Sequence, residues 1–362
     1  MRLTALLTVA AMLTAALPLK TVAQDYHGTK KIGCELGLAY VMGSRQKLSV
    51  EQGYTKIAEC SDLSYIQGNW DEWLRPGLFD KEVELARSKG LKVYVALDLL
   101  GYKPKPRAEL SVPKSLGAKG DFTSADIRSL YLDLVRRIAS EDHPDYFVVL
   151  VEANLHQKFN QPSFAAFKEL YPTVVSEVHR LSPTTKVAAS VVYGDLTEPK
   201  GFDDQDKQYF VQCVQDFDPV SDLLAVSTYP KYYLRPQNIP ISFLCDIASA
   251  SRHPLFISET SWVSHDFKIS IRPFIDYTFK SSPDAQAAYV QRLANCASYA
   301  ELKGVKIEAI NFTTLIDPSK FVSSLLKLAS PQLAWFCYLG LIDGDGNEKP
   351  AFGALKQWKL SR

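Results

Sequence analysis

The hydrophobic residues of this chain fall into short continuous runs, which are separated by longer segments with a different periodicity. Continuous rather than alternating hydrophobicity is typical of parallel strands that are buried on both faces of a sheet. We therefore predict one strand for each run. The predicted strands cover residues 32–38, 63–67, 92–97, 147–151, 186–192, 223–227, 255–258 and 308–313.

The segments between these runs have the period of amphipathic helices. Ile127, Leu130 and Leu134 recur at helical spacing behind Ser124, a predicted N-cap. Residues 282–302 open with serine, proline and aspartate, the order expected where a helix begins. Strands and helices alternate as βα units, so we predict an α/β fold, a closed (β/α)8 TIM barrel. The competing open doubly wound sheet usually has a glycine-rich phosphate-binding turn after its first strand, and the sequence has none there.

The amino-terminal segment has the features of a secretory signal peptide. Arg2 precedes an apolar run over residues 3–17, and small side chains at 21–23 form a predicted cleavage site before Gln24. A membrane anchor is the alternative, but the run is shorter than the roughly 20 residues that cross a bilayer. We predict that residues 1–23 are removed, and that residues 24–362 form one domain of a secreted or periplasmic protein without a membrane span.

Composition and charge narrow the range of partners and cofactors. The chain has 41 basic and 40 acidic residues, so its net charge of +1 gives no electrostatic case for binding nucleic acid. Its six cysteines and six histidines show no CxxC or HExxH spacing, so we predict neither a metal site nor another cofactor. Two interpretations of the cysteines stay open, because they can pair in an oxidising compartment or act as small buried hydrophobic residues.

Two of the predicted strands deliver a glutamate at their carboxyl ends. Glu152 follows the strand over 147–151, and Glu259 follows the strand over 255–258. In a barrel the carboxyl ends of all strands meet on one face, so these two side chains are expected to converge. Hydrolysis of a glycosidic bond uses such a pair of carboxyl groups, one as an acid and one as a nucleophile or base. The alternative is that each glutamate is a structural acid in a salt bridge.

Three segments resemble known enzymes. Residues 256–262, Phe-Ile-Ser-Glu-Thr-Ser-Trp, are similar to strand seven of the clan A (β/α)8 retaining glycoside hydrolases, especially endo-galactanase-like and glucanase-like members. Residues 223–230, which end in Thr-Tyr-Pro, are similar to strand six of that clan. The tail over 335–351 resembles the region that closes many such barrels. The resemblance covers essentially the whole chain after the predicted signal peptide.

The resemblance implies a function and a role for each glutamate. Glu259 corresponds to the nucleophile of a retaining glycosidase and Glu152 to its general acid/base, while Tyr229 corresponds to a tyrosine that hydrogen-bonds the nucleophile. The implied activity is hydrolysis of O-glycosidic bonds in an oligo- or polysaccharide by double displacement. The implied partner is a carbohydrate, and no cofactor takes part.

Further substrate contacts are predicted beside the two glutamates. Trp262 is expected to stack on a sugar ring, although a loop tryptophan can equally cover the core, and Asn154 and Asp98 are expected to contact the substrate. The chain departs from the clan at Val151, where an asparagine usually precedes the acid/base. A noncatalytic carbohydrate-binding protein on a degenerate barrel is therefore the alternative function, followed by a barrel enzyme of another class that uses the carboxylates for proton transfer.

Overall fold

The computed structural model describes residues 31–35, 47–75, 77–101, 109–113, 120–194, 204–272, 275–329 and 331–362. The predicted signal peptide lies outside these residues, so its cleavage stays a prediction. Within the described ranges, no helix has the length and apolarity that a bilayer crossing requires.

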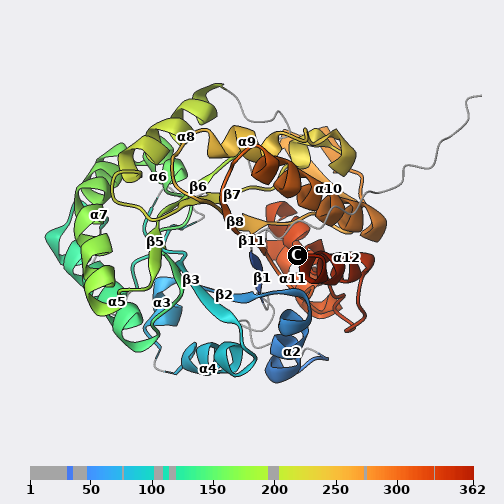
Figure 1. Ribbon diagram of the computed structural model, residues 1–362, viewed down its shortest axis with the longest axis horizontal. Helices are drawn as coiled ribbons and strands as arrows, with labels where there is room; N and C mark the ends of the chain where they lie inside the picture. The colour runs from blue at the N-terminus through green and yellow to red at the C-terminus, as the bar shows by residue number, and fades with distance from the viewer. Residues whose placement is uncertain are drawn as a thin grey trace, which may run out of the picture.

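Parallel strands form a ring at the centre of the molecule, and helices surround it (Figure 1). The strands are β1 (Lys31–Glu35), β2 (Leu63–Gly68), β3 (Lys92–Leu97), β4 (Tyr146–Val148), β5 (Lys186–Ala188), β6 (Ser190–Val192), β7 (Leu224–Ser227), β8 (Leu255–Thr260) and β11 (Ile307–Phe312). Their order in the sheet is β5-β4-β3-β2-β1-β11-β8-β7-β6. Each of the eight predicted strands is present, and the predicted TIM barrel is confirmed.

The predicted fifth strand is divided into β5 and β6 at Ala189. The first half pairs with β4 and the second half with β7, so this single segment closes the ring. The backbone N–H of Ala189 donates to the hydroxyl of Tyr171, 3.1 Å away, instead of to a neighbouring strand. A helix side chain therefore takes the place of a ladder bond at the seam.

The helices pack around the outside of the ring (Figure 1). They are α2 (Val50–Cys60), α3 (Trp70–Trp73), α4 (Asp80–Ser88), α5 (Ala125–Glu141), α6 (Ala153–Phe159), α7 (Gln161–Leu181), α8 (Asp204–Phe217), α9 (Phe243–Ala248), α10 (Pro283–Leu302), α11 (Lys320–Ala329) and α12 (Pro350–Leu360), with short 3-10 turns η2 (Lys231–Tyr233), η3 (Pro236–Asn238) and η4 (Pro331–Tyr338). The predicted cap of α10 is confirmed, because the Ser282 hydroxyl accepts from the N–H of Ala285. Ser124 occupies the N-cap position of α5 but makes no side-chain capping bond.

One element was not predicted. After β8, the antiparallel hairpin of β9 (Phe267–Arg272) and β10 (Ile275–Phe279) projects from the carboxyl-end side of its strand. Its two ends are held together by the rings of Phe267 and Phe279, whose centroids are 5.2 Å apart. The hairpin begins seven residues after the end of β8, the strand that carries Glu259.

A column of aromatic side chains fills the interior of the barrel. Tyr65 stacks on Tyr94 with centroids 4.4 Å apart, Tyr94 meets Phe256 edge-on at 4.8 Å, and Phe256 contacts Tyr146 at 5.3 Å. Each such pair stabilises the fold by about 0.5–1.5 kcal/mol beyond the burial of its area. The barrel is therefore a packed core, and the carboxyl-end mouth is where a ligand can approach.

The opposite, amino-terminal end of the barrel is closed by a cluster of charges around Glu308. Its carboxylate contacts Nζ of Lys31 at 3.1 Å and Nζ of Lys186 at 2.8 Å, and it accepts from the Tyr146 hydroxyl at 2.6 Å. Although burial acts in the opposite direction, these hydrogen bonds lower the pKa of Glu308 to about 2. The cluster lies at the face of a TIM barrel that usually serves stability.

All six cysteines lie among the described residues, and none forms a disulfide. All except Cys245 are buried. Of the two interpretations, the small buried hydrophobic residue is therefore the one that the structure supports.

Candidate active site

Glu259 is directed into the mouth of the barrel by a β-bulge. Phe256 points into the interior, so regular alternation along β8 would turn Glu259 outward. The register with β7 shifts at this point: Val226 pairs with Ile257, whereas the next residue, Ser227, pairs with Glu259. The register with β11 shifts in the same stretch. The extra residue on β8 re-aims the carboxylate, a common use of bulges next to active sites.

The carboxylate of Glu259 is held by two phenols. The Tyr65 hydroxyl donates to Oε1 at 2.9 Å, and the Tyr229 hydroxyl donates to Oε2 at 3.0 Å. The Tyr229 hydroxyl is also 2.8 Å from Oγ1 of Thr313. Burial, followed by the charge of Glu259, raises the pKa of both phenols well above the usual value, so they remain protonated donors. The predicted contact between Tyr229 and Glu259 is thus present.

Glu152 lies four residues beyond the end of β4, in an unusual backbone conformation. Its φ of 57° and ψ of 45° are left-handed, which costs a non-glycine residue roughly 1–3 kcal/mol. Two serines hold it there: its N–H donates to Oγ of Ser190 at 3.0 Å, and Oγ of Ser227 donates to its Oε1 at 3.1 Å. The side chain is buried, so this strained turn delivers a carboxyl group that is fixed by β6 and β7.

The two predicted glutamates converge on the same strand, β7. Ser227 pairs in register with Glu259 and donates its hydroxyl to Glu152. Two residues further along, the pKa of Tyr229 is raised by burial and by the charges of both glutamates. The structure therefore brings Glu152 and Glu259 together beside β7 at the carboxyl ends of the strands, although they lie far apart in the sequence.

Asn154 and Asp98 have different surroundings. The amide of Asn154 clamps the backbone of Val192, accepting from its N–H at 2.8 Å and donating to its carbonyl at 3.0 Å. Asn154 is buried, and its amide ties α6 to β6, so this positioning role replaces the sugar contact that we predicted. Asp98 follows β3 on the same face as the inward-facing Ala96, is half-buried, and accepts from Nε2 of Gln67 at 3.0 Å. Its contact with substrate stays a prediction.

The predicted sugar platform at Trp262 is wrong. Its ring is 1% exposed, lies against Tyr289 with centroids 5.4 Å apart, and donates from Nε1 to Oγ of Ser281 at 3.0 Å. The chain after Glu259 turns away from the mouth into the outer layer of the core. Of the two interpretations of Trp262, covering the core is the one that holds.

Another tryptophan packs against Tyr229, the hydrogen-bond partner of Glu259. Trp335 of η4 meets Tyr229 edge-on with centroids 5.0 Å apart, and Nζ of Lys231 lies 3.9 Å from the centre of its ring. Sequence reasoning noted Trp335 only as part of the closing tail. Its place beside Tyr229 depends on a tertiary contact that has no local signal.

Sequence reasoning also missed two polar residues of the mouth, Glu35 and Tyr65. Glu35 is the last described residue of β1; we predicted a strand over residues 32–38 and gave Glu35 no role, and residues 36–38 lie outside the described part of the chain. Tyr65 was assigned to a strand without a role, but strand alternation turns it inward, toward Glu259.

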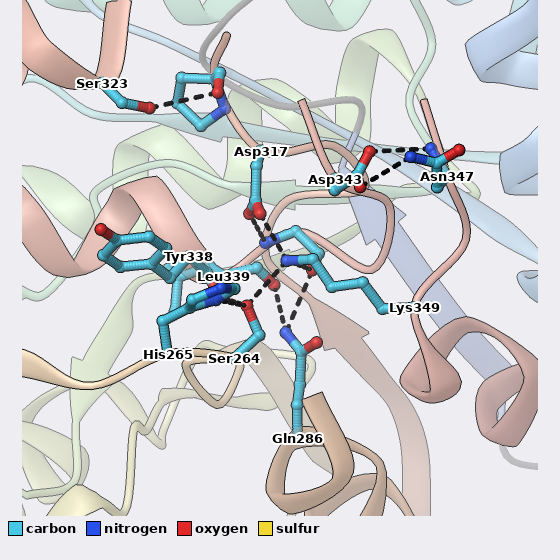
Figure 2. A network of polar contacts seen from close by, with 12 residues as sticks. Ser264, His265, Gln286, Asp317, Ser323, Tyr338, Leu339, Asp343, Asn347 and Lys349 are labelled. Atoms are coloured by element: carbon cyan, nitrogen blue, oxygen red, sulfur yellow. Dashed lines mark hydrogen bonds and ion pairs between the residues drawn. The ribbon is translucent and has the colours of Figure 1, made fainter. Parts of the chain in front are cut away.

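A buried ion pair anchors the loop that follows β8 (Figure 2). Nζ of Lys349 contacts the Asp317 carboxylate and donates to Oγ of Ser264 at 2.9 Å and to the carbonyl of Gly340 at 2.7 Å. Gln286 of α10 adds hydrogen bonds from Nε2 to the same loop and tail. One ammonium group thus joins the loop after β8, the loop after β11 and the carboxyl-terminal tail.

Solved structures with a similar fold include several glycoside hydrolases. GH5_18 from Streptomyces cattleya in complex with GlcNAc aligns with a TM-score of 0.64 and 13% identity, over 92% of this chain and 80% of that chain. A structure of two fungal beta-1,4-galactanases gives 0.63 and 15%, over 91% and 100%. A beta-glycosidase gives 0.61 and 11%, over 86% and 85%.

No family model and no curated protein sequence matches the chain. At the low identities of the structural matches, the likeness concerns the fold. The predicted resemblance to the barrels of glycoside hydrolases is confirmed at that level.

Proposed function

We propose that this protein is a retaining glycoside hydrolase, with Glu259 as the nucleophile and Glu152 as the general acid/base. The observation that carries the proposal is the pair of carboxyl groups on either side of β7, at the carboxyl-end mouth of a barrel with the glycoside hydrolase fold. Retaining enzymes need such a pair, in which one group attacks and the other transfers a proton.

In the first step, an oxygen of Glu259 attacks the anomeric carbon while Glu152 gives its proton to the departing oxygen. The bond between the anomeric carbon and that oxygen breaks, and a glycosyl ester forms on Glu259. The hydroxyls of Tyr65 and Tyr229 fix the plane of the attacking carboxylate. Because both carboxylate oxygens accept a hydrogen bond, Glu259 favours the ionised form that a nucleophile requires.

In the second step, the ionised Glu152 takes a proton from water, and the resulting hydroxide displaces Glu259 from the anomeric carbon. The hydroxyl of Ser227 donates to Oε1 of Glu152 and holds this carboxyl group in place. Both carboxyl groups return to their starting states, and the anomeric configuration is retained. No cofactor is needed for either step.

The substrate class is an oligo- or polysaccharide with O-glycosidic bonds. The structural neighbours support this choice because one is a complex with GlcNAc and another is a pair of beta-1,4-galactanases. A carbohydrate polymer also suits the predicted secretion or periplasmic location, where such polymers are met outside the cytoplasm.

A screen of aryl glycosides and polysaccharides with the wild type and the E259Q variant tests the proposal. We expect hydrolysis by the wild type with retention of configuration, seen by NMR of the first product, and a loss of at least about 10³-fold in E259Q. Sugar affinity should survive in E259Q. A wild type that binds sugars and hydrolyses no glycoside would instead support the noncatalytic carbohydrate-binding protein.

A further inference from the structure

A third carboxyl group, that of Glu35, shares the mouth with the proposed nucleophile. Ile32 and Cys34 of β1 pack in the core layer between the ring and the helices, so alternation turns Glu35 toward the interior. Glu35 is the last residue of β1 and pairs in register with Tyr65, whose hydroxyl donates to Glu259. Glu35 is half-buried, and the charge of Glu259 acts on its carboxyl group, so the two acids lie close together at the mouth.

The loop after β11 holds the end of β1 in place. The N–H of Leu315 donates to the carbonyl of Glu35 at 2.6 Å, and the N–H of Thr314 donates to the Glu35 carboxyl group. Thr314 has a φ of 75°, a left-handed conformation that is unfavourable for a β-branched residue. These contacts fix the Glu35 side chain on a rigid part of the barrel.

The hydrogen-bond donors decide which of the two neighbouring acids keeps its proton. Two carboxyl groups that lie close together ionise in succession, and hydrogen-bond donors favour the ionised form of the group that they contact. Glu259 receives the hydroxyls of Tyr65 and Tyr229, whereas Glu35 receives a backbone N–H. Burial and then the charge of Glu259 raise the pKa of Glu35 to about 8. At neutral pH, Glu259 is therefore charged and Glu35 is neutral.

The other groups that act on Glu35 reinforce this assignment. Glu82 of α4 and Asp98 after β3 are acids, and both raise its pKa further. Burial is the main cause that raises the pKa of the nearby Tyr54, Tyr65 and Tyr94 phenols and of the Cys34 thiol, and an ionised Glu35 raises it further. A neutral Glu35 therefore suits these described neighbours.

We propose that Glu35 is a neutral carboxylic acid of the sugar-binding site, and that it donates its proton in a hydrogen bond to a hydroxyl of the sugar that Glu259 attacks. The proposal rests on the glycosidase function proposed above. A neutral carboxyl group has one donor and an acceptor, which matches a sugar hydroxyl. An ionised Glu35 would lose that donor and place a second negative charge beside Glu259.

Two substitutions separate this role from a purely structural one. Glutamine keeps the shape and a donor but does not titrate, whereas leucine removes the hydrogen bond. We expect kcat/KM to fall by less than about tenfold in E35Q and by about 10- to 100-fold in E35L, the range for a lost hydrogen bond in a desolvated site.

The pH profile gives a readout that packing alone would not change. In the wild type, loss of the Glu35 proton should lower kcat/KM in a step of the basic limb with a midpoint near pH 8. This step should be absent in E35Q. D142N is the matched control, because burial raises the pKa of Asp142 to about 6 at the far end of α5, away from the mouth. D142N should keep the wild-type profile, and a step that persists in E35Q would overturn the proposal.

A carboxyl titration by NMR tests Glu35 without any turnover. In protein labelled with ¹³C-glutamate, the signal that is missing from E35Q should titrate near pH 8 and move to lower pH in E259Q, where the neighbouring charge is gone. A titration midpoint near pH 4.5, or a midpoint that is the same in the wild type and E259Q, would refute the neutral state of Glu35. If the wild type hydrolyses no glycoside, the proposed function fails, and this titration still decides the state of Glu35.

Discussion

Replacing Tyr229 by phenylalanine tests how the site controls its nucleophile. The change removes one hydroxyl, which lies 3.0 Å from Oε2 of Glu259 and 2.8 Å from Oγ1 of Thr313, and it keeps the ring that packs on Trp335. The second donor, Tyr65, remains on Oε1. The variant therefore removes one of the two hydroxyls on the Glu259 carboxylate, together with the contact to Thr313.

The expected effect follows from the strength of such a bond. A hydrogen bond to a charged group contributes about 1.5–3 kcal/mol, which corresponds to a loss of roughly 10- to 150-fold in kcat/KM. The bond stabilises the ionised form of Glu259, so its removal should raise the pKa of this carboxylate by about 1–2 units. Because the nucleophile must be ionised, the acidic limb of the pH profile should move to higher pH by that amount.

The assay is kcat/KM against pH with an aryl glycoside that the wild type hydrolyses. Y131F is the matched control, since Tyr131 is a buried tyrosine whose hydroxyl donates to the carbonyl of Val149 at 2.9 Å, away from Glu259. Y131F should lose about 1 kcal/mol of stability and leave the acidic limb in place. An acidic limb that stays unchanged in Y229F would refute the view that Tyr229 holds the charge of Glu259.

Two further predictions concern stability. K349M leaves the buried Asp317 carboxylate without its cation, so the free energy of unfolding in urea should fall by about 3–5 kcal/mol. Adding D317N to K349M should recover part of this loss. Full stability in K349M alone would contradict the prediction. E308Q should cost about 2–3 kcal/mol at pH 7, because the pKa of Glu308 is lowered from 4.5 to about 2 on folding. A carboxyl group whose pKa is lowered on folding stabilises the fold at pH values above its pKa in the unfolded chain. The difference in the free energy of unfolding between the wild type and E308Q should therefore shrink as the pH falls from 4.5 to 2. A constant difference over that range would count against a stabilising role of the cluster around Glu308.

The strands of the barrel could be predicted because their signal is local. A parallel strand buried on both faces must be continuously apolar, and each predicted run became a strand of the ring. The break at Ala189 could not be predicted, since it depends on the Tyr171 hydroxyl, which reaches the seam from α7. The sequence pattern thus finds the segments, while side chains from other elements decide where the ladder is interrupted.

The candidate site divides in the same way. Strand ends and the family resemblance identified Glu152, Glu259 and Tyr229, which the structure brings to one mouth. The resemblance did not identify the bulge that turns Glu259 inward, because an extra residue is visible only in the register with the neighbouring strands. It misplaced Trp262, which lies close to Glu259 in sequence but on the other side of the strand end, packed on Tyr289.

The chemical role of Glu259 is the central claim, and covalent trapping tests it most directly. A 2-deoxy-2-fluoro glycoside with a good leaving group forms the glycosyl-enzyme and slows its hydrolysis, so the adduct can be located by peptide mass spectrometry. The account predicts one added sugar on the peptide that contains Glu259, and none in E259Q. A sugar on another carboxylate, or inactivation without a covalent adduct, would contradict it.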